Sequence, residues 1–179
     1  SSISNITNDN IYYLNENYRN TQQITEFCNA EFSADIFPVG VEGEKVLNYS
    51  LAEAVTKIIN MKKTDPTLRT AIIYKTGIEA IVDALKKLLI HEKVSWDIVN
   101  DDILSVVTVE IAKGLEFDSV VAVIDQMSDN EKYISFTRAL DNLIVVRDAF
   151  DENKPDDDFE DESNDALDES YENSTSNEL

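Results

Sequence analysis

The stretch that decides the fold is Val120-Val121-Ala122-Val123-Ile124, five consecutive apolar residues with no polar interruption. A strand with one face in water alternates apolar and polar residues, whereas a strand covered on both faces is apolar throughout. We therefore expect a buried strand at residues 120–125, with a layer of structure on each side. The sequence predicts five further strands, at residues 11–14, 46–49, 70–74, 104–109 and 143–146.

Segments with helical periodicity lie between these strands. One apolar stripe consists of Leu51, Ala54, Val55, Ile58 and Ile59, and a second consists of Ile78, Ile81, Val82, Leu85, Leu88 and Leu89. The S/T-x-x-E spacing of a capping box predicts helix starts at Ser50, Thr76 and Ser128. Strands that alternate with helices predict an α/β fold in which helices sandwich a mostly parallel sheet.

Length and composition indicate one domain followed by an acidic tail. The chain has 179 residues, 42% of them hydrophobic, which is enough for one sizeable core. After about Ala149 apolar residues become scarce, so we assign residues 1–149 to the domain and 150–179 to a tail that is expected to be disordered. Two interpretations of the tail stay open: a solvating segment, or a mimic of nucleic acid that occupies a basic channel in a partner.

The charge of the chain argues against some classes of function. Residues 151–179 hold 13 of the 36 acidic residues and one of the 15 basic residues, so the tail carries −12 of the net −21 and the domain −9. Nucleic-acid-binding modules usually present a basic patch. This chain has no such patch, which argues against strong DNA binding by this part alone. The single cysteine, Cys28, makes disulfides and cysteine metal sites unexpected, and no metal site is predicted.

Other features bear on location. No apolar run approaches the ~20 residues that a membrane helix needs, and the N-terminus lacks the pattern of a signal peptide. We interpret the protein as cytoplasmic, without membrane partners. Because it begins at Ser1 without a methionine, we expect a piece of a longer chain.

Three segments contain polar, charged or glycine residues that packing alone does not require. The first is Asn15-Glu16-Asn17-Tyr18-Arg19-Asn20-Thr21, between the predicted strand 11–14 and the next helix. Ligands of open α/β sheets sit beyond the carboxyl ends of strands, where Tyr18 could stack on a base and Arg19 could pair with phosphate. The alternative is an ordinary turn with a surface arginine.

The second segment is Ala112-Lys113-Gly114-Leu115-Glu116-Phe117-Asp118, between two apolar strands. Gly114 permits backbone geometry closed to other residues, so the loop could approach a ligand closely. Glu116 could accept hydrogen bonds from sugar hydroxyls. The alternative is a tight crossover between buried strands.

The third segment surrounds Arg138. In a helix that begins near Asp129, the residues Tyr133, Phe136, Leu140 and Leu143 would form an apolar stripe, and Arg138 would point away from it. An arginine held in this way could act as an arginine finger, which stabilises charge on a phosphoryl group in transfer. The alternative is a surface arginine in a salt bridge.

Taken in order, these segments resemble motifs of the UvrD/Rep-type superfamily 1 helicases. Asn17–Thr21 resembles motif IV, Thr108-Val109-Glu110-Ile111-Ala112-Lys113-Gly114-Leu115-Glu116-Phe117-Asp118 resembles motif V, and Thr137-Arg138-Ala139 resembles motif VI. Residues 69–75 resemble the strand before the family's accessory-domain insertion. The resemblance implies a RecA-like, P-loop NTPase-type domain in the C-terminal half of an ATP-dependent DNA helicase-like motor.

The resemblance also implies roles for individual residues. Tyr18 would stack on adenine, Arg19 would touch the terminal phosphates, and Arg138 would reach the γ-phosphate. Glu116 would bind the ribose or help couple the site. Lys113 and Gly114 would shape the motif V loop, and Thr108 and Glu110 would couple it to nucleic acid. The cofactor would be ATP with Mg²⁺. This chain has no G-x-x-x-x-G-K-[ST] loop, so the Mg²⁺ ligands would lie in a preceding RecA-like domain, and the isolated chain is predicted to be inactive.

Two departures from the family pattern modify this expectation. Only about thirty residues separate Tyr74 from Leu104, too few for the large accessory domain. Glu110-Ile111 stands where motif V helicases usually have a histidine, and a carboxylate repels phosphate. These features resemble the HelD branch, whose members act on RNA polymerase, so the expected partner is DNA or RNA polymerase. The alternative from another class is a non-catalytic α/β interaction module that kept the fold and lost the chemistry.

Overall fold

A six-stranded parallel sheet forms the centre of the protein. The computed structural model describes residues 20–34 and 40–151. The strands are β1 (Leu47–Asn48), β2 (Thr70–Tyr74), β3 (Val94–Trp96), β4 (Leu104–Thr108), β5 (Phe117–Val123) and β6 (Ala139–Val146). Their order across the sheet is β1-β6-β5-β2-β4-β3, and each pair of neighbours is parallel. The predicted parallel sheet is confirmed, while the predicted strand 11–14 lies outside the described residues.

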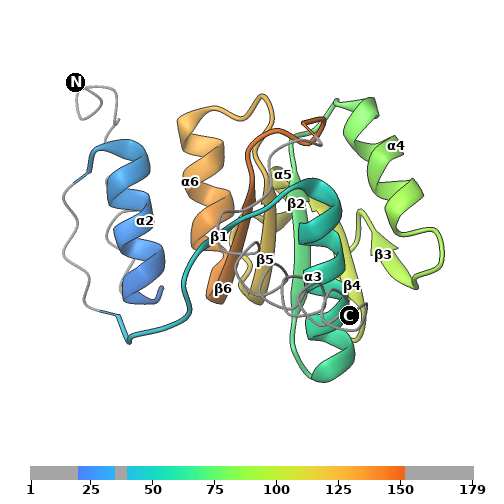
Figure 1. The fold of residues 1–179 in the computed structure, drawn as a ribbon, viewed down its shortest axis with the longest axis horizontal. Coiled ribbons are helices and arrows are strands. Elements are labelled where there is room, and N and C mark those ends of the chain that lie inside the picture. The colour runs from blue at the N-terminus through green and yellow to red at the C-terminus, as the bar shows by residue number, and fades with distance from the viewer. Residues whose placement is uncertain (1–19, 35–39, 152–179) are drawn as a thin grey trace, which may run out of the picture.

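Helices cover both faces of this sheet (Figure 1). On one face lie α2 (Gln22–Phe32), α5 (Val109–Ala112) and α6 (Asp129–Thr137), which share a core with side chains such as Ile73 and Val120. On the other face lie α3 (Leu51–Thr64) and α4 (Glu79–Leu88), which share a second core with side chains such as Ile72 and Val121. The protein is therefore a three-layer α/β sandwich, consistent with the expected RecA-like fold.

The strand β5 explains why the apolar run decides the fold. Successive side chains of a strand point to opposite faces of the sheet. Val120 and Ala122 belong to the core under α2, α5 and α6, whereas Val121 and Val123 belong to the core under α3 and α4. All four side chains are fully buried, which is why no position in the run tolerates a polar residue.

Two of the three predicted helix starts are confirmed by their caps. The hydroxyl of Ser50 accepts from the N–H of Glu53, and Ser128 and Glu131 form a complete capping box. The start predicted at Thr76 is wrong, because α4 begins at Glu79 and Ile78 at its N-cap makes no side-chain cap bond. Gly77 adopts a φ of +89°, so the chain turns between Thr76 and the helix and the threonine lies too early to cap it.

The helix expected to carry Arg138 is shorter than its apolar spacing predicts. It ends at Thr137, so Leu140 and Leu143 belong to β6 and not to a helical stripe. The helix ends there because the following residues pair with a strand of the sheet. Ala139 pairs with Phe117 of β5, and the N–H of Phe117 donates to the carbonyl oxygen of Arg138 at 2.9 Å, which draws the chain into extended conformation.

Parallel strands give the sheet two chemically distinct edges. The strands all begin at one edge, here called the amino edge, and end at the other, the carboxyl edge. Every connection between consecutive strands therefore runs back from the carboxyl edge to the amino edge. Two of these connections matter most below: residues 109–116, which contain α5, and residues 124–138, which contain α6. Among the described residues, no helix combines the length and apolar character needed to cross a membrane.

Ile72→Ala should lower the free energy of unfolding by about 2–5 kcal/mol, because the truncation leaves a cavity in β2 between β4 and β5. Ile72 is fully buried, whereas Ile98 is 70% exposed and serves as the matched control. Ile98→Ala should change stability by no more than about 0.5 kcal/mol. Urea denaturation measures both variants, and equal small losses would contradict the buried position of β2.

Candidate functional site

Arg138 lies at the amino edge, at the C-cap of α6. Its side chain is buried, with 7% of the residue exposed. Its Nε donates to the carbonyl oxygen of Ile134 at 3.1 Å, its Nη1 to that of Leu115 at 3.2 Å, and its Nη2 to the hydroxyl of Thr137 at 3.3 Å. Arg138 is therefore not a surface residue. Arg138 instead links the end of α6 to the loop before β5.

Asn20, in the first predicted segment, contacts the residues on either side of Arg138. It is buried, and its Nδ2 donates to the carbonyl oxygens of Thr137 at 3.1 Å and Ala139 at 2.8 Å. One acceptor lies two residues before Ala139 and the other on Ala139 itself, the first residue of β6, so Asn20 lies at the amino edge. Tyr18 and Arg19 lie outside the described residues, so their placement stays a prediction.

The backbone around Asn20 is held by a second segment. Thr21 caps α2 by accepting from the N–H of Ile24, and the N–H of Gln22 donates to the carbonyl oxygen of Val41 at 2.9 Å. Gly40 lies so close that a Cβ at this position would collide with the carbonyl oxygen of Asn20. Only glycine permits this approach, which fixes the start of α2 beside the start of β6.

The loop 113–116 forms the exposed side of this cluster. Gly114 has a φ of +82°, and a Cβ added there would meet no atom within 4 Å. The residue is therefore glycine for its backbone conformation and not for lack of space. Lys113 and Gly114 are exposed and Glu116 is half-buried. At the end of the segment, Asp118 accepts from the backbone N–H of Arg69 at 2.8 Å, which fixes the start of β5 beside that of β2.

Thr108 and Glu110 lie at the opposite, carboxyl edge. Thr108 ends β4 and caps α5 by accepting from the N–H of Ile111. The exposed Glu110 accepts from the hydroxyl of Thr76 at 2.7 Å. This bond lowers the pKa of Glu110, as do its own N–H and the Thr108 hydroxyl, against burial and the charge of Glu131. The predicted residues thus form two groups: Gly114, Glu116 and Arg138 with Lys113 at one edge, and Thr108 with Glu110 at the other.

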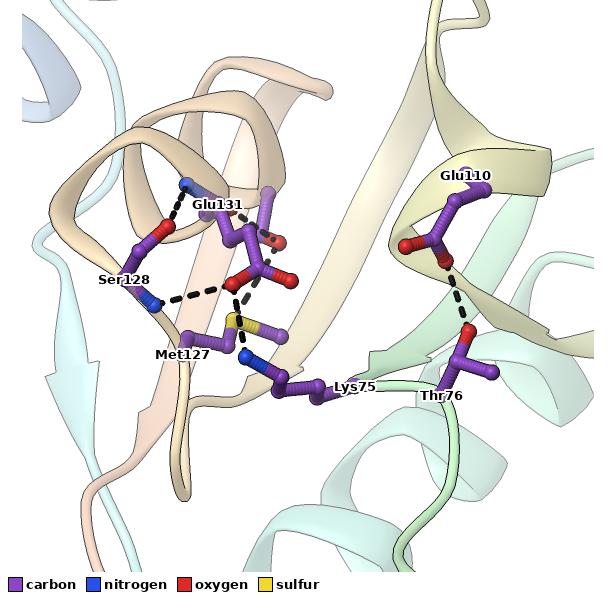
Figure 2. Close-up of polar contacts among 7 residues, drawn as sticks. Lys75, Thr76, Glu110, Met127, Ser128 and Glu131 are labelled. Carbon is purple, nitrogen blue, oxygen red and sulfur yellow. Dashed lines mark hydrogen bonds and ion pairs between the residues drawn. The ribbon is translucent and has the colours of Figure 1, made fainter.

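A second contact at the carboxyl edge involves Lys75, which follows β2. Its ammonium lies 2.9 Å from Oε1 of Glu131, the oxygen that also accepts from the N–H of Ser128 at 3.0 Å (Figure 2). Burial opposes ionisation of Glu131, but these two donors outweigh it and lower the pKa of the carboxyl group. The carboxylate is therefore ionised at neutral pH and pairs with Lys75.

Sequence reasoning did not predict the contacts of Asn20, Lys75 and Thr76. For Lys75 and Thr76 a signal was available, since polar residues directly after a buried strand lie at its carboxyl end. The capping-box pattern at Thr76 obscured it. For Asn20 no signal was available, because its acceptors are backbone oxygens more than a hundred residues away in the chain.

Cysteine and metal chemistry have little support in the described part of the chain. Cys28 is fully buried in α2, and burial, together with the charge of Glu31, raises the pKa of its thiol to about 12. At neutral pH the group is therefore a thiol and a poor nucleophile. Within residues 20–34 and 40–151, no three His, Cys, Asp or Glu side chains are grouped to hold a metal ion.

Comparison with known proteins points to a helicase C-terminal domain as the class of protein with this architecture. One similar solved structure is the C-terminal domain of a possible DNA helicase from Lactobacillus plantarum WCFS1, with a TM-score of 0.51 and 25% sequence identity. The alignment covers 72% of this chain and 86% of that chain. No family model matches the chain. No curated protein matches it either. The likeness supports the coarser part of the resemblance and leaves the UvrD or HelD branch as a proposal.

Asn20→Asp should destabilise the domain in a pH-dependent way. A buried carboxylate that faces two carbonyl oxygens has a raised folded-state pKa, while its unfolded pKa stays at about 3.9. The deficit relative to the wild type should therefore be smallest below about pH 4 and grow as the pH rises toward the folded-state pKa. Chemical denaturation at several pH values measures it.

The control for this experiment is Asn60→Asp, because Asn60 is exposed on α3. The difference between this variant and the wild type should change little over the same pH range. A pH-independent deficit for Asn20→Asp would contradict the two hydrogen bonds that Asn20 donates.

Proposed function

We propose that this chain is the C-terminal RecA-like domain of an ATP-dependent superfamily 1 helicase-type motor, and that its amino edge completes an ATP site. The observation that carries the proposal is the bond from Arg138 to the carbonyl oxygen of Leu115. It joins the segment that resembles motif VI to the loop that resembles motif V. Asn20 adds the segment that resembles motif IV.

The residues at the amino edge fit one wall of a nucleotide site. Arg138 supplies a permanent positive charge, and Gly114 leaves open space beside the loop. Glu116 would accept from the ribose, and Lys113 would shape the loop. Tyr18 and Arg19 complete the proposed wall as the groups for adenine and terminal phosphates. The phosphate loop and the Mg²⁺ ligands would come from a preceding RecA-like domain, where Mg²⁺ neutralises phosphate charge.

The proposed work of Arg138 is electrostatic. A guanidinium has five N–H donors in a rigid plane, so one bond can be exchanged for a phosphate oxygen while the others hold the side chain. Burial among backbone oxygens keeps the group in a single orientation and lowers the local dielectric constant. Both effects strengthen its interaction with charge that develops on a transferring phosphoryl group.

The negative charge at the carboxyl edge favours RNA polymerase over duplex DNA as the partner on which the motor acts. Glu110 presents a carboxylate where nucleic-acid phosphates would pass, and the chain carries a net charge of −21. Phosphate repulsion at this edge weakens the case for strand tracking. Remodelling of RNA polymerase, as in the HelD branch, is therefore the finer form of the proposal, and movement on DNA is its competitor.

The stimulation of ATPase activity separates these two forms. If the motor acts on polymerase, added RNA polymerase should raise turnover of the full-length protein, and duplex or single-stranded DNA alone should leave it near its basal value. Stimulation by DNA alone would favour a true helicase or translocase.

One observation favours the non-catalytic interaction module. Three N–H groups of Arg138 donate to oxygen atoms of the domain itself, so the residue also serves as a structural link. In that case the cluster would hold α2, α6 and β5 together without chemistry, and Arg138 would affect stability alone.

Arg138→Lys in the full-length protein should lower kcat by about 10³-fold, because an ammonium cannot reproduce the guanidinium at the transferring phosphate. Turnover is measured with saturating ATP and Mg²⁺. Arg147→Lys is the matched control, since Arg147 forms a two-bond ion pair with Glu31 in the same domain. Unchanged turnover in a folded Arg138→Lys protein would refute the catalytic proposal and leave the interaction module.

The isolated chain should show no Mg²⁺-dependent ATP hydrolysis, because it lacks a phosphate loop. A purified sample assayed for phosphate release over several hours tests this. Turnover above that of a mock preparation would mean that the site is complete within this chain.

A further inference from the structure

The turn after β2 contacts α5 and α6, the two helices that lead to the loop 113–116 and to Arg138. The Lys75 ammonium pairs with Glu131 at 2.9 Å, and the Thr76 hydroxyl donates to Glu110 at 2.7 Å. Figure 2 shows the two neighbouring side chains diverging from one turn, Lys75 toward α6 and Thr76 toward α5. Two adjacent residues therefore tie β2 to two different helices.

Each acceptor begins a segment that ends in the candidate site. Glu131 lies in the first turn of α6, and Arg138 is the C-cap of the same helix. Seven residues at 1.5 Å per residue place these two positions roughly 10 Å apart along the helix axis. Glu110 lies in α5, which leads directly into the loop 113–116. The position of each helix along the sheet therefore sets the position of a group at the amino edge.

The contact between Lys75 and Glu131 is partly shielded from water, whereas that between Thr76 and Glu110 is exposed. The side chains of Lys75 and Glu131 are 33% and 21% exposed, so their attraction is screened less than that of a fully exposed pair. Glu131 also keeps its bonds with Ser128, so the start of α6 does not depend on Lys75. Loss of the Lys75 charge would release the helix from β2 without removing its cap.

We propose that Lys75 and Thr76 are positioning residues that hold α6 and α5 in the register that the ATP site requires. This inference rests on the proposed function. Lys75 sets Arg138 through α6, and Thr76 sets the loop 113–116 through α5. Neither residue touches the nucleotide wall, since both lie at the carboxyl edge. The turn after β2 thereby connects the edge where a partner would bind to the edge where ATP would be hydrolysed.

The test compares disruptive and conservative variants in the full-length protein. Lys75→Met and Thr76→Val should lower kcat by about 10- to 100-fold, the effect of displacing a catalytic group by about 1 Å. KM for ATP should stay within about twofold, because the groups that bind ATP in the ground state are unchanged. Lys75→Arg and Thr76→Ser keep the charge and the hydroxyl and should retain most of the turnover.

The matched control is Lys63→Met, which removes an ion pair of similar length, 3.1 Å to Glu92, on the other face of the sheet. It should leave kcat unchanged. A double-mutant cycle adds Glu131→Gln to Lys75→Met. If the pair acts as one unit, the double variant should be no slower than Lys75→Met alone.

A second measurement on this chain needs no ATPase activity. Hydrogen exchange at the amides of Leu115 and Phe117 should accelerate in Lys75→Met and Thr76→Val and stay unchanged in Lys63→Met. Wild-type kcat and exchange in both disruptive variants would overturn the positioning role, and so would equal losses in Lys63→Met. The proposed function fails separately: it is refuted if Arg138→Lys leaves turnover unchanged, whatever Lys75 and Thr76 do.

Discussion

The pairing of β5 with β6 determines where Arg138 and the loop 113–116 lie at the amino edge. The register begins with Phe117 opposite Ala139, and the Phe117 N–H donates to the carbonyl oxygen of Arg138. That one pairing ends α6, ends the loop 113–116 and places Arg138 beside Leu115. Beyond the irregularity between Phe117 and Ser119, a shift of β6 by one residue against β5 would turn the apolar side chains of β6 to the wrong faces, so the two cores enforce the register. The positions of Arg138 and the loop 113–116 therefore depend on the packing of the sheet.

The two edges of the sheet are stabilised by different kinds of acceptor. At the amino edge, Asn20 and Arg138 donate mainly to backbone oxygens, which the fold supplies whatever the side chains are. At the carboxyl edge, Lys75 and Thr76 meet carboxylates, which exist only if Glu131 and Glu110 are present. A single substitution of an acceptor can therefore remove a hydrogen bond or ion pair at the carboxyl edge, while the bonds at the amino edge remain. The two edges also differ in burial. A buried donor that loses its acceptor destabilises a protein more than an exposed one, so loss of a bond at the amino edge costs more stability.

Sequence patterns predicted those parts of the molecule in which burial dictates residue type. The run Val120–Ile124 is apolar because both of its faces are covered. The caps at Ser50 and Ser128 need a short side chain with an oxygen acceptor. The same kind of pattern failed where a different constraint produced it. Thr76 has the spacing of a cap but precedes Gly77, whose positive φ separates it from the helix. Leu140 and Leu143 continue a helical spacing by coincidence, since strand pairing governs them. Long-range hydrogen bonds to backbone oxygens, such as that from Arg138 to Leu115, cannot be predicted from the sequence, because every residue type has a backbone oxygen.

The strand β3 stands last in the sheet order, beyond β4 and far from β5 and β6. The turn that leads to it from α4 is largely exposed, and Ile90 within it is 72% exposed. Added residues in a surface turn cost little in closure entropy, and each doubling of loop length costs only about 0.6 kcal/mol. The domain can therefore grow or shrink at this outer margin without moving α6. Related proteins could differ greatly in size at this turn and share the same amino edge, and a fluorescent protein inserted there should leave the fold intact.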